Sequence, residues 1–79
     1  MPSESLADVT QNDWIRACRK LGLEVDTRHG KGSHVLVKHP RDGRKYTIQR
    51  DLHRVINLKI LKKLVEWGFS EKDVFEAIQ

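Results

Sequence analysis

Hydrophobic residues in the first third of the chain follow the spacing of a helix. Thr10 and Asp13 form the pattern of a capping box, which starts a helix, and Gly22 is a typical stop at its end. One face of this helix would carry four apolar residues, Trp14, Ile15, Cys18 and Leu21. The spacing predicts a short amphipathic helix, and we expect Cys18 to act as a small buried apolar side chain.

The pattern then changes to a period of two. Residues 23–28, 33–39 and 44–49 alternate apolar and polar positions, which is typical of strands with one buried face. The segments between them, 29–32 and 40–43, contain glycine and have the composition of tight turns. Strands joined by such short turns pair as neighbours, so we expect a three-stranded antiparallel sheet.

The middle strand indicates which side chains the sheet would bury. Val35 and Val37 fall on one face, which we expect to pack against helices. The other face would carry His34, Leu36 and Lys38. It would stay open, because the helices can cover one side of the sheet only.

Helical spacing returns in the last third. The apolar stripe that we expect to lie in the core is formed by Leu58, Leu61, Leu64 and Val65. Asp51 or Asn57 would cap this helix. Ser70 and Asp73 form the pattern of a second capping box, which opens a short helix with three inward residues, Val74, Phe75 and Ile78.

A length of 79 residues fits one small domain. We predict the α+β class, with a single domain over residues 10–79 and a flexible leader over residues 1–9. The hydrophobic fraction of 38% suits a modest core and excludes a disordered chain. No apolar run approaches the ~20 residues of a membrane span, and the N-terminus has no signal-peptide pattern. We therefore expect a soluble, cytoplasmic protein.

Charge is distributed unevenly along the chain. The net charge is +4, but residues 28–63, the central basic block, hold eleven Lys and Arg against two Asp, a net charge of +9. The flanking segments 1–27 and 64–79 are acidic overall. A concentrated positive field attracts polyanions such as nucleic acid. The alternative is a solvated basic surface without a partner.

Cysteine and histidine are placed unfavourably for a metal site. Cys18 is the only cysteine, so an internal disulfide is excluded. His29, His34 and His39 recur every five residues, so successive ones fall on opposite faces of a strand and do not converge on one ion. We expect neither a metal nor a cofactor.

His34 is the candidate catalytic residue. It would project from the open side of the sheet among Arg28, Lys31 and Lys38. Histidine exchanges protons near neutral pH, and neighbouring cations favour its neutral form and stabilise negative charge on a reacting phosphate. The residue types alone leave two alternatives open, a histidine that only contacts phosphate and an ordinary surface histidine.

Six short motifs follow one another between residues 11 and 75. They are Gly32-Ser33-His34, Lys38-His39-Pro40, Asp42-Gly43-Arg44, Thr47-Ile48, Leu61-Lys62-Lys63 and Gly68-Phe69-Ser70. Their order and spacing resemble the HicA-type toxins, also called the YcfA-like family. The resemblance covers nearly the whole chain.

The resemblance implies a double-stranded-RNA-binding-domain-like fold of order α-β-β-β-α, here with an extra short C-terminal helix. It implies a ribosome-independent mRNA interferase, the toxin of a type II toxin–antitoxin pair, whose partners are mRNA and a HicB-type antitoxin. The family's functional histidine corresponds to His34, a general acid/base for metal-independent RNA cleavage. We expect the antitoxin to cover His34 and Leu36. The expected RNA-binding residues are Arg28, Lys31, Gly32, Ser33, Lys38, Arg44 and Lys45.

Other functions are compatible with the same residues. A non-catalytic RNA-binding module of the same fold would hold RNA on its basic surface without cleaving it. A protein-interaction module would dock an acidic partner there instead. DNA binding is the weakest alternative, because only the last two helices have helix–turn–helix spacing and the final one is acidic.

Overall fold

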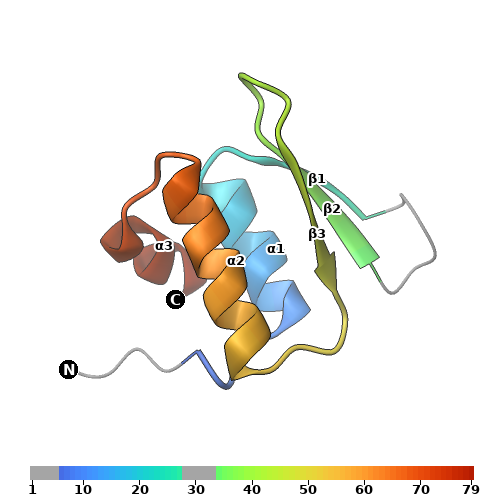
Figure 1. Cartoon of the computed structure of the whole chain (residues 1–79), viewed down its shortest axis with the longest axis vertical. Helices are drawn as coiled ribbons and strands as arrows, with labels where there is room; N and C mark the ends of the chain where they lie inside the picture. The colour runs from blue at the N-terminus through green and yellow to red at the C-terminus, as the bar shows by residue number, and fades with distance from the viewer. Residues whose placement is uncertain (1–5, 28–33) are drawn as a thin grey trace.

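The structure is a computed structural model that describes residues 6–27 and 34–79 (Figure 1). Its elements are α1 (Gln11–Lys20), β1 (Glu24–Asp26), β2 (His34–Lys38), β3 (Lys45–Gln49), α2 (Arg54–Glu66) and α3 (Glu71–Ile78). The predicted α+β class and the predicted order of elements are confirmed. Within these two ranges, no helix is long and apolar enough to cross a lipid bilayer.

The three helices lie on one face of the sheet (Figure 1). The strands are antiparallel in the order β1-β2-β3. Val35 and Val37 of β2 and Ile48 of β3 are buried, whereas His34 and Lys38 are exposed. Successive side chains of a strand point to opposite faces, and the burial of these residues confirms the predicted alternation.

The core lies between the sheet and the helices. Its helical residues are Trp14, Ala17 and Cys18 from α1, Ile60, Leu61 and Leu64 from α2, and Val74 and Ala77 from α3. Cys18 is fully buried, as predicted, and desolvation raises the pKa of its thiol to about 12. The thiol therefore stays protonated at neutral pH and packs as an apolar group.

Helix α1 begins at the predicted capping box. The Thr10 hydroxyl accepts a hydrogen bond from the Asp13 backbone N–H (3.2 Å), and the Asp13 carboxylate accepts one from the Thr10 backbone N–H (2.9 Å). This second bond is the main reason that the pKa of Asp13 is lowered. Gly22 follows α1 at a φ of 88°, a left-handed conformation that glycine adopts without strain.

Asn57 is a buried polar residue inside α2 and not its cap. Its Oδ1 accepts a hydrogen bond from Trp14 Nε1 (2.8 Å), and its Nδ2 donates to the carbonyl oxygens of Leu6 and Val9. The expectation that Asp51 or Asn57 caps this helix is therefore wrong. The capping position belongs to His53, whose side chain makes no capping hydrogen bond to the described helix.

The N-terminal segment is packed against the core where the structure describes it. Leu6 and Val9 are buried in the core cluster, and Asn57 holds their carbonyl groups. The expected leader over residues 1–9 is thus wrong for residues 6–9, while residues 1–5 lie outside the described part of the chain. The contacts that hold this segment come from a residue about 50 positions away.

The buried face of α2 is rotated relative to the expected stripe. Leu61 and Leu64 are buried as predicted, but Leu58 and Val65 are 41% and 40% exposed, and Ile60 is buried. The buried positions 57, 60, 61 and 64 have the period of a helix. The expected stripe differs from the buried row because that row includes the polar Asn57, which a search for apolar positions passes over.

Candidate nucleic-acid interface

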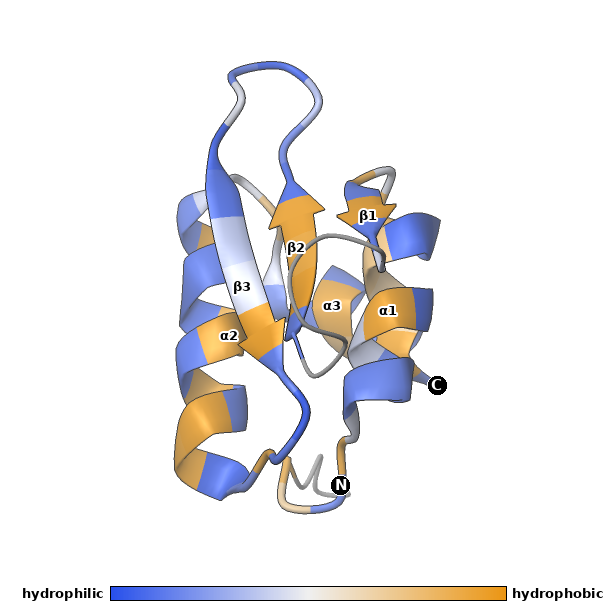
Figure 2. Cartoon of the chain, turned by 90° about the vertical axis from the view of Figure 1, so that its right-hand side faces the viewer, coloured by the Kyte–Doolittle hydropathy of each residue, from blue (hydrophilic) through white to orange (hydrophobic). Residues whose placement is uncertain are grey.

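The sheet surface that points away from the helices carries the candidate site (Figure 2). Strand register arranges its side chains in three rows, which are His34 with Gln49, Asp26 with Leu36 and Thr47, and Glu24 with Lys38 and Lys45. We call these eight residues the open face. All are exposed except Leu36, which is half-buried. The expected uncovered side of the sheet is therefore present.

His34 lies at one end of the open face. It is the first residue of β2, it is exposed, and its register partner on β3 is Gln49. Leu36 and Lys38 follow on the same face at steps of two residues. A histidine, an aliphatic side chain and an ammonium group therefore lie in line along β2, over about 13 Å at the usual rise of a strand.

Two carboxylates change the charge of this surface. Glu24 and Asp26 of β1 lie opposite Lys38 and Leu36 and share their face. In the sequence they belong to the acidic segment before the central basic block, but strand pairing brings them beside it. The open face is therefore basic along β2 and β3 at Lys38 and Lys45, and acidic along β1.

A depression on the open face lies beside two of the three rows, those of Leu36 and Lys38, and is not lined by His34 or Gln49. It is lined by Arg19 from α1 and by strand residues that include Asp26, Leu36, Lys38 and Lys45. Arg19 and the two β1 carboxylates were not among the expected site residues. The alternation of residues 23–28 places Glu24 and Asp26 on the polar face of a strand, so their position could have been predicted. Arg19 belongs to α1, and no sequence pattern relates it to the sheet.

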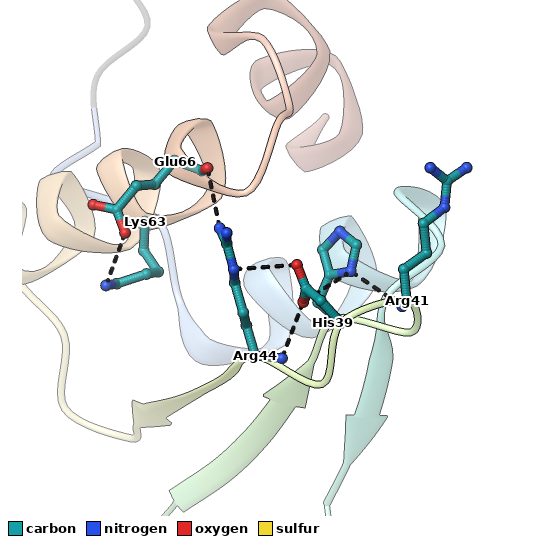
Figure 3. A network of polar contacts seen from close by, with 6 residues as sticks. His39, Arg41, Arg44, Lys63 and Glu66 are labelled. Carbon is teal, nitrogen blue, oxygen red and sulfur yellow. Dashed lines mark hydrogen bonds and ion pairs between the residues drawn. The ribbon is translucent and has the colours of Figure 1, made fainter.

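Arg44, an expected RNA-binding residue, holds the β2–β3 turn against the end of α2 (Figure 3). Its Nε pairs with Asp42 Oδ2 (3.1 Å), and its Nη1 donates to the carbonyl oxygen of Glu66 (3.4 Å). The side chain remains 52% exposed. Arg44 lies in the turn after Lys38, at the opposite end of β2 from His34. Arg44 and His34 therefore do not belong to one cluster.

His39 contributes to the same attachment, which we call the hairpin latch and define as the contacts of His39 and Arg44. The His39 side chain is only 14% exposed. Its Nδ1 accepts a hydrogen bond from the Arg41 backbone N–H (3.2 Å), and its ring meets Trp67 edge-on with a centroid distance of 5.9 Å. His39 is therefore turned toward the end of α2 (Figure 3).

Replacing His39 by alanine should loosen the turn without unfolding the domain. The change removes the acceptor of the Arg41 amide and the ring contact with Trp67, each worth about 1 kcal/mol. We expect the free energy of unfolding to fall by about 1–2 kcal/mol and amide hydrogen exchange to accelerate at Arg41 and Gly43. His53→Ala is the matched control and should leave this exchange unchanged. Equal exchange in both variants would contradict the latch.

The remaining expected site residues, Arg28, Lys31, Gly32 and Ser33, lie outside the described residues, as does His29. Across residues 6–27 and 34–79, no group of three His, Cys, Asp or Glu side chains is arranged to hold a metal ion. The described groups of the site that can act chemically are therefore one histidine, two lysines and two carboxylates, around one half-buried leucine.

The chain matches none of the protein-family models, curated proteins or solved structures with which it was compared. The resemblance to the HicA-type toxins therefore depends on the six sequence motifs alone.

Proposed function

We propose that the chain is a metal-independent mRNA endonuclease of the HicA type, with a double-stranded-RNA-binding-domain-like fold and an added α3. The observation that carries the proposal is the position of His34. The residue that the motif pattern marks as functional is exposed on the sheet face that the helices leave open. An extended polyanion can reach it there, in line with Leu36 and Lys38.

The chemistry we propose is attack by a ribose 2′-hydroxyl on the adjacent phosphate. His34 accepts the hydroxyl proton while the bond from the 2′ oxygen to phosphorus forms. The bond from phosphorus to the 5′ oxygen breaks, and that oxygen takes a proton from the imidazolium or from water. The products are a 2′,3′-cyclic phosphate and a 5′-hydroxyl end, and no electrons are exchanged. The cationic residues that we expect to stabilise the added negative charge of the phosphate are Arg28 and Lys31, which precede His34 in the sequence.

The experiment that tests this function is incubation of the purified protein with RNA in the presence of EDTA. We expect cleavage to continue without divalent ions and to leave 2′,3′-cyclic phosphate ends, identified by mass spectrometry. Intact RNA under every condition, or cleavage that needs a metal ion, would reject the proposal.

We propose a HicB-type antitoxin as the protein partner, bound over the open face. Leu36 supports this, because it is an aliphatic side chain in the middle row of an otherwise polar surface. In a complex with the antitoxin, the amides of residues 34–38 should gain protection from hydrogen exchange. Protection that spares β2 and appears only on the helices would place the partner elsewhere.

A non-catalytic RNA-binding module of the same fold is the second candidate. The observation in its favour is that the register partner of His34 is Gln49, which cannot donate or accept a proton in catalysis. Strongly salt-dependent RNA binding without cleavage would select this candidate.

A further inference from the structure

Two lysines stand directly opposite each other on the open face. Lys38 of β2 and Lys45 of β3 are register partners, and both are exposed. Like charges at opposite positions destabilise a strand pair. Within the described part of the chain neither lysine forms an ion pair, although Glu24 lies across from Lys38 on the other side. An anion held between the two ammonium groups would remove this repulsion.

The lysine pair lies at a defined distance from His34. Lys38 follows His34 by four positions in β2, which is about 13 Å at the usual rise of a strand. Leu36 lies midway between them on the same face, and Arg19 lines the same depression as both lysines. The pair is therefore too far from His34 to bind the phosphate that reacts there.

The carboxylates of β1 limit the width of the basic part of the open face, which is formed by Lys38 and Lys45. Lys38 and Lys45 lie on β2 and β3, while the carboxylates of Glu24 and Asp26 lie on β1, about 5 Å to the side at the usual strand spacing. Phosphates are attracted to one side of the open face and repelled from the other. This basic part fits one extended nucleic-acid strand along β2.

We propose that Lys38 and Lys45 together bind one backbone phosphate of a single-stranded RNA that runs along β2, and that this phosphate is not the one cleaved at His34. Leu36 contacts the nucleotide between the two positions. The choice of RNA as the ligand and the identification of the cleaved phosphate rest on the proposed function, whereas the pairing of the two exposed lysines is observed.

The test is a binding scan with single-stranded RNA oligonucleotides that each carry one neutral methylphosphonate linkage. The protein carries His34→Ala so that binding is measured without cleavage. We expect one linkage, distinct from the cleaved one, at which neutralisation weakens binding about tenfold, as for loss of a charge-assisted hydrogen bond. In protein that also carries Lys38→Gln and Lys45→Gln, the same linkage should have no effect.

Lys62→Gln with Lys72→Gln is the matched control, because it removes two exposed lysines from α2 and α3. It should keep the full effect of the neutral linkage. The same RNA annealed into a duplex should bind more weakly than the single strand. An undiminished effect in the Lys38→Gln, Lys45→Gln protein, an effect only at the cleaved linkage, or tighter duplex binding would overturn the inference. Cleavage by the unmutated protein is measured separately. Absence of cleavage would reject the proposed function without affecting the phosphate site, and absence of the linkage effect would reject the phosphate site without affecting the proposed function.

Discussion

Replacement of His34 by alanine should lower the rate of RNA cleavage by about 10²–10⁴-fold, the usual contribution of a general acid/base. The imidazole is the proton acceptor in the proposed attack, and the register partner Gln49 cannot replace it. Affinity for RNA should change little, because the basic side chains of the open face remain. The rate is measured on purified RNA under single-turnover conditions with EDTA present.

Two further measurements separate catalysis from a structural effect. Added imidazole should restore part of the activity of the His34→Ala protein, since it can occupy the vacated space and accept the proton. His53→Ala is the matched control, because His53 is also exposed but lies before α2, and it should keep full activity. Equal cleavage by the His34→Ala and unmutated proteins would refute the catalytic role.

Replacement of Asn57 by alanine should destabilise the domain more than any other polar substitution in the described chain. The change leaves the Trp14 indole N–H and the carbonyl groups of Leu6 and Val9 without their buried partner. Unpaired buried groups cost about 1–3 kcal/mol each, and the removed atoms add a cavity. We expect a loss of about 3–5 kcal/mol in the free energy of unfolding, a large fraction of the total for a small domain.

The measurement is thermal and urea unfolding followed by circular dichroism and tryptophan fluorescence. For a domain of this size, such a loss lowers Tm by about 15 °C or more. Asn12→Ala is the matched control, because Asn12 is exposed on α1, and it should stay within about 0.5 kcal/mol. Asn57→Asp keeps an acceptor for Trp14 but loses both donors, so it should also be strongly destabilised. A small effect of Asn57→Ala would show that the N-terminal segment is not held by this residue.

The lysine-rich α2 shows why the buried face of a helix can be misjudged from apolar positions. Its buried row contains the polar Asn57, whose burial is stabilised by hydrogen bonds to α1 and to the N-terminal segment. Val55, Leu58 and Val65 lie outside this row and remain exposed. Hydrophobicity alone cannot identify a buried amide, because the partners that satisfy it are distant in the chain.

The site shows the same division between local and distant causes. The alternation within β2 placed His34, Leu36 and Lys38 on one face, and the structure agrees. The alignment of Lys45 with Lys38, the carboxylates of β1 beside them and the contribution of Arg19 depend on strand register and on packing. Arg44 was expected at the RNA-binding surface. In the structure its side chain contacts Asp42 in the turn and the carbonyl oxygen of Glu66 in α2, and the second contact depends on the packing of the turn against α2.

By itself the sequence determined the α+β order of elements, the capping box at Thr10 and Asp13, the side of the sheet that stays open and the position of His34 on it. These features follow from short-range periodicity and capping, which act over a few residues. Only the tertiary structure decided that Leu6 and Val9 are packed, that Asn57 holds them, and that the open face is basic on one side and acidic on the other. Those features depend on groups brought together from distant parts of the chain, where hydrogen-bond partners and neighbouring charges are set by packing and strand register and not by local pattern.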